Sequence, residues 1–294
     1  MKIAIFGQYY QNDTRPIIRD IFVFFNANNT ELVVEKKFLD TLYKEEIVKK
    51  EYKTFADHKD LDSSFDMLVS IGGDGTILRA ATYVRDSGIP ILGINAGRLG
   101  FLASVQQENI NEFLMLVLKK DFKISPRTLL SLSCLPKIDS VDDINFALNE
   151  ITVSRKDTTS MITIETSLNG EYLNSYWADG LIISTPTGST GYSLSCGGPV
   201  LTPDVKSLVI TPIAPHNLNA RPLVITDETE IELKVTGREK QYLVSLDSRI
   251  ATVDNNTILK ITKTPFQINM VEINNETFLK TLRKKLLWGE DKRN

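Results

Sequence analysis

A run of apolar residues, followed at once by glycines and then by a helical pattern, is the clearest signal in this chain. Residues 65–71 are mostly apolar, which is typical of a strand covered on both faces of a sheet. After the glycine-rich segment Gly72-Gly73-Asp74-Gly75-Thr76, apolar residues recur at helical spacing, at Ile77, Leu78, Ala80, Ala81 and Val84. The pattern predicts a buried strand, a glycine turn and a helix.

The rest of the N-terminal part alternates between the two periods in the same way. Strands are predicted at residues 2–6, 31–34 and 89–94, and helices at residues 14–25 and 108–120. The charged stretch at residues 44–53 is interpreted as a solvated helix or loop. Strands that alternate with helices favour a parallel sheet, and therefore a Rossmann-like α/β domain.

The pattern changes near residue 123 to short alternating strands separated by turns. Asn169-Gly170, between two of them, is a strong hairpin signal. The predicted strands cover residues 129–135, 145–154, 161–168, 171–177, 180–185, 208–212, 223–226, 230–235, 241–246 and 257–262. So many short strands predict a C-terminal β-sandwich domain.

Residues 275–288 return to a helical pattern with one apolar side, which we expect to pack back on the first domain. The predicted domains are therefore residues 1–125, completed by residues 272–294, and residues 126–271.

Composition narrows the class of protein. The chain has 294 residues, is 42% hydrophobic and 24% charged, and carries a formal net charge of -3, as ordinary globular proteins do. This charge gives no general attraction to nucleic acid or to anionic membranes, and no apolar run is long enough to span a bilayer. Two distant cysteines and the absence of a signal-peptide pattern make a cytoplasmic location the expectation.

The glycine turn is a candidate phosphate site. Gly72, Gly73 and Gly75 let backbone amides approach phosphate oxygens, and the following helix adds its positive N-terminal end. Asp74 could hold Mg²⁺ or act as a base toward a hydroxyl, whereas in the alternative interpretation it only caps the helix. Arg79 and Arg98 are candidates to reach phosphates near the turn.

A second candidate site lies in the β-rich part. Residues 185–199 (TPTGSTGYSLSCGGP) are too polar for a core and too long for a hairpin turn. Their glycines allow close approach of a ligand, and their hydroxyls and Tyr192 offer hydrogen bonds and a flat face for a base. Asn149-Glu150, within a predicted strand, suits ribose hydroxyls or a base edge.

These motifs together resemble the ATP-dependent NAD kinases. The resemblance rests on Gly72-Gly73-Asp74-Gly75-Thr76, Asn149-Glu150, Asp179-Gly180, residues 185–199, Pro215-His216 and residues 220–223, in order and at fitting intervals, and it covers essentially the whole chain. The glycine pentad, residues 72–76, is shared with phosphofructokinases and lipid kinases. Residues 185–199, called here the serine-threonine loop, are together with Asn149-Glu150 specific to NAD kinases.

The resemblance implies transfer of the ATP γ-phosphate to the adenosine 2′-hydroxyl of NAD, with Mg²⁺ assistance and Asp74 as the general base. It implies that Glu150 holds ribose hydroxyls and that Asn149 and Asp179 contact base or amide groups. The other implied binding residues are Gly72, Gly73, Gly75, Thr76, Arg79, Thr190, Gly191, Tyr192, Ser193, Leu194, Ser195, Ala214 and Arg249. A homodimer or homotetramer is also implied, with no nucleic-acid or membrane partner.

Several positions depart from the common family pattern. Trp177 and Ala178 stand where many bacterial members have a basic residue, and Ser160 stands where a histidine or arginine often occurs. Arg249 replaces a frequent glutamine. These positions bear on whether NADH is also accepted. The alternatives are another pentad-bearing kinase, acting on a lipid or a sugar phosphate, and a noncatalytic dinucleotide-binding regulator.

Overall fold

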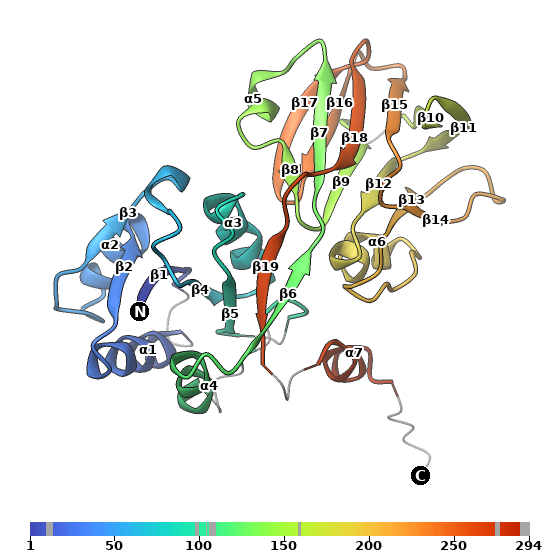
Figure 1. Ribbon diagram of the computed structural model, residues 1–294. Coiled ribbons are helices and arrows are strands. Elements are labelled where there is room, and N and C mark those ends of the chain that lie inside the picture. The colour runs from blue at the N-terminus through green and yellow to red at the C-terminus, as the bar shows by residue number, and fades with distance from the viewer. Residues whose placement is uncertain are drawn as a thin grey trace. The chain divides into compact units, whose positions relative to one another are not determined.

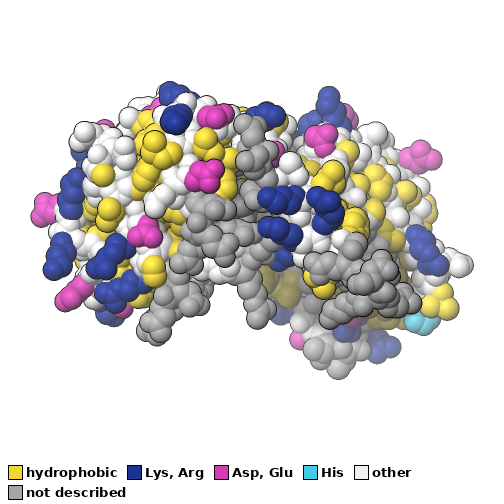
Figure 2. All heavy atoms as spheres, turned by 90° about the horizontal axis from the view of Figure 1, so that it is seen from below, with side chains coloured by type: hydrophobic (Ala, Val, Ile, Leu, Met, Phe, Trp, Pro, Cys, Tyr) yellow, Lys and Arg dark blue, Asp and Glu magenta, His cyan; other side chains and the backbone are white. Residues whose placement is uncertain are grey.

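The computed structural model describes residues 1–9, 14–97, 100–103, 105, 110–157, 160–273 and 277–288; the remaining residues are grey in Figures 1 and 2. The chain divides into two compact units. Unit 1 comprises Met1–Pro126 and Ile268–Asn294, and unit 2 comprises Arg127–Gln267. Each unit has its own sheets and its own hydrophobic core.

Unit 1 is an α/β domain. Its elements are β1 (Lys2–Gly7), α1 (Arg15–Ala27), β2 (Glu31–Glu35), α2 (Lys36–Lys44), β3 (Lys53–Phe55), the short 3₁₀ helix η1 (His58–Asp60), β4 (Met67–Gly72), α3 (Asp74–Val84), β5 (Ile91–Asn95), α4 (Ile110–Leu118), β6 (Lys123–Arg127), β19 (Ile268–Glu272) and α7 (Phe278–Leu286). They form one seven-stranded sheet in the order β3-β2-β1-β4-β5-β19-β6 (Figure 1). The pairs from β3 to β19 are parallel, as the alternation of strands and helices predicted.

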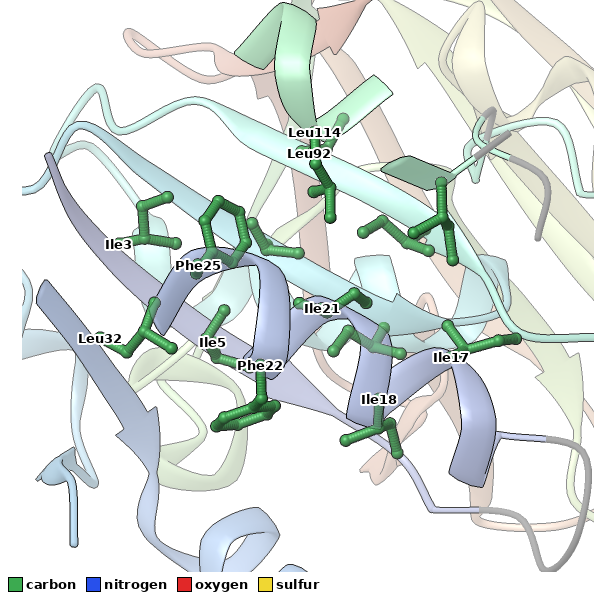
Figure 3. Packing of buried hydrophobic residues seen from close by; sticks show 14 of the residues in the cluster. Ile3, Ile5, Ile17, Ile18, Ile21, Phe22, Phe25, Leu32, Leu92 and Leu114 are labelled. Carbon is green, nitrogen blue, oxygen red and sulfur yellow. The ribbon is translucent and has the colours of Figure 1, made fainter. Parts of the chain in front are cut away.

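The core of unit 1 follows from the alternation of side chains along β1. Ile3 and Ile5 point to one face, where they pack against the apolar side of α1, including Ile21 and Phe25 (Figure 3). Phe6 points to the other face, where its ring centroid lies 5.2 Å from that of Tyr83 on α3. Helices thus cover both faces, which explains why β4 is buried along its whole length.

Unit 2 is built from two antiparallel sheets. Its elements are β7 (Leu130–Leu135), α5 (Asp139–Asp142), β8 (Phe146–Ala147), β9 (Glu150–Arg155), β10 (Ile162–Leu168), β11 (Glu171–Ala178), β12 (Gly180–Ser184), η3 (Thr187–Thr190), α6 (Tyr192–Ser195), β13 (Ser207–Ile213), β14 (Leu223–Thr226), β15 (Ile231–Thr236), β16 (Gln241–Leu246), β17 (Arg249–Asp254) and β18 (Ile258–Lys263). The six-stranded sheets run β11-β10-β15-β18-β7-β8 and β14-β13-β12-β9-β16-β17. Their inner faces share one core cluster, which confirms the predicted sandwich.

Several elements were not predicted: the strands β3, β6, β17 and β19, the helices α2, α5 and α6, and the 3₁₀ helices η1 and η3. The helix α2 is short and largely polar, but its Phe38, Leu39 and Leu42 are buried. The strand β19 returns to the first sheet between β5 and β6, a placement that no local pattern indicates. The predicted terminal helix is present as α7, and its Phe278 ring lies 6.3 Å from that of Phe101 in the same unit.

The single strand predicted at residues 145–154 was wrong in one respect. It is divided into β8 and β9, which belong to different sheets. At the break, the backbone N–H groups of Leu148, Asn149 and Glu150 donate to the carboxylate of Asp247. A side chain therefore takes the hydrogen bonds that a continuous strand would use for its ladder.

Candidate functional site

The glycine turn of unit 1 joins β4 to α3, as the sequence predicted. Gly72 approaches Thr76 so closely that a Cβ on it would lie 2.3 Å from the Thr76 hydroxyl oxygen. Cβ atoms at Gly73 and Gly75 would meet no atom of the described residues within 4 Å. The backbone beside these two glycines is therefore open to a ligand at the N-terminal end of α3, where anions bind.

Asp74 is the first residue of α3, and its side chain does not cap its own helix. The carboxylate instead accepts hydrogen bonds from the backbone N–H groups of Phe101 (2.8 Å), Leu102 (3.0 Å) and Ala103 (3.1 Å). The alternative role as a helix cap is therefore not what the structure shows. The residue is half-buried beside the open glycine turn.

The other candidates in unit 1 differ in their surroundings. Thr76 is buried and its hydroxyl donates to Gln8 at 3.2 Å. Arg79 is exposed on α3, whereas Arg98 lies outside the described residues. Thus, Thr76 supports the turn from inside, and Arg79 has the freedom to reach an anion.

In unit 2, Asn149 directly precedes β9 and Glu150 is its first residue, and the two side chains carry two unsatisfied polar atoms. The Asn149 Oδ1 and the Glu150 Oε2 are inaccessible to solvent, and neither has a hydrogen-bond partner in the described part of the chain. Buried polar atoms normally have partners, because leaving one without costs about 1–3 kcal/mol. Two such neighbouring atoms are candidates for contact with hydroxyl or amide groups of a ligand.

The environment of Glu150 favours its protonated form. Burial raises the pKa of this carboxyl group to about 7, the negative charge of Asp247 adds to the effect, and a hydrogen bond from the Tyr192 backbone opposes it. The protonated acid can donate a hydrogen bond, and the carboxylate can only accept. The side chain can therefore adapt to a diol near neutral pH.

The serine-threonine loop is more regular than the sequence indicated, because it folds into η3 and α6. Thr185 fixes its start: its hydroxyl donates to the Leu148 carbonyl at 2.6 Å and accepts from the Gly188 N–H at 3.1 Å. A Cβ on Gly188 would lie 2.1 Å from the Asn149 carbonyl oxygen, and one on Gly191 would lie 3.2 Å from the Glu150 Oε2. These glycines bring the loop against the Asn149-Glu150 pair.

The predicted residues of this loop point in different directions. Tyr192 is 47% exposed, and Ser195 is also exposed. Ser193 is buried, and its hydroxyl hydrogen-bonds that of Thr211 on β13 at 2.8 Å. Thr190, Gly191 and Leu194 are partly exposed. The loop thus offers Tyr192 outward, while Ser193 anchors it to the sheet.

Asp179 directly precedes β12, and Ala214 directly follows β13, which pairs with β12. Both residues lie at the end of this strand pair that is opposite to Ser184, the partner of Glu150. The Asp179 N–H donates to the Ile213 carbonyl, the residue before Ala214, at 3.0 Å. The Asp179 carboxylate pairs with Arg155, with 3.0 Å between Oδ2 and Nη2. Charges at both ends of β12 affect Tyr192. Burial is the main factor that raises the pKa of its hydroxyl group, and the charges of Cys196, Asp179 and Glu150 contribute.

The structure gives Arg249 several contacts within unit 2. It donates to the carbonyl of Ile144 at 2.7 Å and to that of Phe146, and its guanidinium lies 5.6 Å from the Phe146 ring. Trp177 is 49% exposed and lies against His216, with ring centroids 4.2 Å apart. Both residues were noted as departures from the family pattern; Trp177 is exposed, whereas the Arg249 side chain is partly buried and 30% exposed.

Sequence reasoning missed three residues that hold these sites together: Gly100, Arg155 and Asp247. Asp247 had a usable signal, because Asp247-Ser248 is the two-residue turn between β16 and β17, and Asp247 has a φ of 52°. The partners of its carboxylate are about a hundred positions away in the chain, and no local pattern indicates them.

Three further findings concern ligand classes. Positive and negative side chains are interspersed over the described part of the face shown in Figure 2, as expected for a net charge of -3. In the described ranges, no group of three or more His, Cys, Asp or Glu side chains could hold a metal ion. No described helix is both long and apolar enough to cross a membrane.

Comparison with known proteins gives consistent matches. Residues 4–122 match the ATP-NAD kinase N-terminal domain, and residues 148–273 match the ATP-NAD kinase C-terminal domain. The NAD kinase of Flavobacterium johnsoniae is 72% identical over 294 residues, covering 100% of both chains.

Solved structures agree with these matches. An NAD kinase from Archaeoglobus fulgidus in complex with ATP has 28% identity and a TM-score of 0.73, covering 98% of this chain and 99% of that one. A yeast NADH kinase complexed with NADH has a TM-score of 0.89, covering 100% of this chain and 89% of that one; at 21% identity, this likeness concerns the fold.

Proposed function

This chain belongs to the NAD kinase family and converts NAD to NADP with ATP, and from this premise we propose that Asp74 is the general base of the reaction. The observation that carries the proposal is the position of its carboxylate. It is half-buried at the first residue of α3, next to glycines whose backbone is open to a ligand. A carboxylate at this point can take a proton from a hydroxyl while the helix N-terminus faces phosphate.

The proposed step is an in-line transfer. Asp74 accepts the proton of the adenosine 2′-hydroxyl, and the electron pair of that O–H bond stays on the 2′-oxygen. This oxygen forms a bond to the γ-phosphorus of ATP as the bond from that phosphorus to the β,γ-bridging oxygen breaks, and ADP leaves. Phosphoryl transfer depends mainly on positioning and charge neutralisation. One well-placed carboxylate is therefore sufficient as the acid-base group of the protein.

We assign ribose binding to Glu150 and base or amide contacts to Asn149 and Asp179. The unsatisfied Glu150 Oε2 and Asn149 Oδ1 support this assignment, because a bound diol or amide would supply the partners that they lack. Tyr192 offers an exposed ring for stacking, and Thr190, Gly191, Leu194, Ser195 and Ala214 are proposed to line the nucleotide pocket with it. Arg249 is kept as a binding candidate despite its internal contacts.

Mg²⁺ fits the described residues as an ion that arrives on the phosphates of ATP. This ion commonly uses one or two carboxylates together with substrate phosphates and water, so a protein cage is not required. When bound, it would neutralise phosphate charge, and the open backbone at Gly73 and Gly75 and the exposed Arg79 would contact the phosphates. A cytoplasmic location and a homodimeric or homotetrameric assembly also stay predictions.

The experiment that tests the proposal is single-turnover conversion of NAD to NADP by the purified protein with Mg-ATP. NADH, diacylglycerol, sphingosine and fructose 6-phosphate serve as alternative acceptors. We expect NADP from NAD, no phosphorylated lipid or sugar, and loss of the product in Asp74→Asn. Binding of NAD without any NADP formation would contradict the proposal and favour a regulator or another phosphoryl donor.

A further inference from the structure

The carboxylate of Asp74 lies in a nest of backbone amides that the loop after β5 supplies. The Phe101 N–H donates to Oδ2 at 2.8 Å, and the N–H groups of Leu102 and Ala103 donate to Oδ1 at 3.0 and 3.1 Å. Successive backbone amides form such concave anion sites in many proteins. Here the anion is the protein's own side chain.

The two carboxylate oxygens are not equivalent in this nest. A carboxylate oxygen offers about two lone-pair sites. Oδ1 accepts two hydrogen bonds and is filled, whereas Oδ2 accepts one and keeps a site. In the part of the chain that the structure describes, no other donor bonds Oδ2. This oxygen is therefore the one that can receive a proton.

Gly100 makes room for the carboxylate. It is buried, and a Cβ on it would lie 1.9 Å from the Asp74 Oδ1 and 2.5 Å from its Cγ, far inside any allowed contact. Gly97, three residues earlier, is exposed, and a Cβ there would meet no described atom within 4 Å. The two glycines offer a matched pair, because alanine disturbs Asp74 at only one of them.

The nest is fixed to the central sheet. The Asn95 N–H donates to the Val105 carbonyl at 2.8 Å, and the Val105 N–H donates to the Gly93 carbonyl at 3.4 Å. A Cβ on Gly93 would lie 3.1 Å from both the Ala103 Cα and the Leu102 carbonyl oxygen, so the loop packs directly on β5. Since β5 pairs with β4, which leads into Asp74, the nest and its carboxylate share one rigid support.

We propose that Gly100 and the backbone N–H groups of Phe101, Leu102 and Ala103 are positioning groups for phosphoryl transfer. They fix Asp74 so that its Oδ2 is the atom that takes the proton of the 2′-hydroxyl. This inference rests on the proposed role of Asp74 as the base. It adds that the orientation of this base depends on a glycine 26 residues later in the chain.

A double-mutant cycle on the full-length protein tests the proposal, with Gly100→Ala, Asp74→Ala, the double variant and Gly97→Ala as the control. For each variant we would measure kcat, the KM for NAD and the midpoint of urea unfolding. We expect Gly100→Ala to lower kcat by about tenfold to a hundredfold, because small misplacements of catalytic groups have such effects. The KM for NAD should stay within about twofold, and Gly97→Ala should match the unchanged protein.

The unfolding midpoints separate positioning from simple damage to the loop. Gly100→Ala should lower the midpoint when Asp74 is present and should not lower it in the Asp74→Ala background, because the clash is with that carboxylate. An equal decrease in both backgrounds, or an unchanged kcat in Gly100→Ala, would overturn the inference. Full turnover in Asp74→Ala alone would contradict the proposed base itself, which distinguishes the two failures.

Discussion

Two aspartates, one in each unit, bind three consecutive backbone amides in almost the same way. Asp74 accepts from Phe101, Leu102 and Ala103. Asp247 accepts from the residues at positions 148–150, at 2.8 to 3.3 Å. Their exposure differs: Asp74 is half-buried beside an open turn, whereas the side chain of Asp247 is only 4% exposed.

This difference decides what each carboxylate can do. Burial raises the pKa of Asp247, and the three amide donors and the charge of Arg249 oppose that effect. A ligand cannot readily reach a carboxylate in such a position, so we interpret Asp247 as a support that holds Asn149 and Glu150. The same hydrogen-bonding arrangement thus holds a proposed catalytic base where the carboxylate is open to a ligand, and a structural support where it is closed.

The largest effect is expected for Asp74→Asn, which keeps the shape of the side chain but removes the base. We expect kcat to fall by about a hundredfold to ten-thousandfold, the range typical of lost general-base assistance. Folding and NAD binding should be largely kept, as measured by circular dichroism and by isothermal titration with NAD. Turnover equal to that of the unchanged protein would contradict the proposal that Asp74 is the general base.

Removal of the closed carboxylate should affect stability more than chemistry. Asp247→Ala leaves three backbone N–H groups without their acceptor, and we expect the free energy of unfolding in urea to fall by about 2–4 kcal/mol. Asp254→Ala, at the exposed end of the same hairpin, is the matched control and should change it by less than about 0.5 kcal/mol. Equal losses in the two variants would show that Asp247 is not a special support.

The Glu150 carboxyl group, which lies near the supporting Asp247, makes the stability of the protein depend on pH. Its pKa is raised to about 7 in the folded protein, above its ordinary value of 4.5, mainly by burial and further by Asp247. Between these values the folded chain binds a proton that the unfolded chain releases, so this group's contribution to stability is lost as pH rises toward 8.

Glu150→Gln removes this titration. Relative to this variant, the unchanged protein should lose roughly 2 kcal/mol of unfolding free energy between pH 5 and pH 8. Urea unfolding at the two pH values measures the difference. In an Asp247→Asn background the pH effect should become smaller, and a difference that is constant with pH would rule out the raised pKa.

The smallest effect is expected for Arg249→Gln, which installs the residue common in the family. The guanidinium Nη2 lies 3.8 Å from the Asp247 Oδ2, and the side chain donates to two backbone carbonyls. We expect a loss of about 1 kcal/mol in the free energy of unfolding, because glutamine keeps part of this hydrogen bonding. A loss as large as that of Asp247→Ala would mean that the arginine, and not the amide nest, carries the support.

The sequence alone predicted the fold and the candidate residues wherever the signal was local. The apolar run before Gly72 and the helical spacing after Thr76 gave the position of β4 and α3. Asn169-Gly170 correctly indicated the hairpin between β10 and β11. In these places, periodicity and turn chemistry agree with the final structure.

The remaining features depend on contacts between distant parts of the chain. At the break between β8 and β9, the Asp247 carboxylate accepts three backbone hydrogen bonds, and Gly100 leaves room for the Asp74 carboxylate in its amide nest because it has no side chain. The polarity of Asp74 and Asp247 does not indicate which backbone N–H groups donate to their carboxylates. Sequence reasoning therefore found the Asp74 carboxylate but missed Asp247, and it could not find which backbone groups either one contacts.

The position of β19 has a consequence for how the chain is made. Residues 268–272 form the strand between β5 and β6, so the first sheet is incomplete until all of unit 2 has been synthesised. During synthesis, β6 lacks its inner neighbour while all of Arg127–Gln267 is being added. Unpaired strand edges favour misassembly and aggregation. A product that ends before residue 268 therefore lacks the strand that joins β5 to β6 in the sheet that carries Asp74.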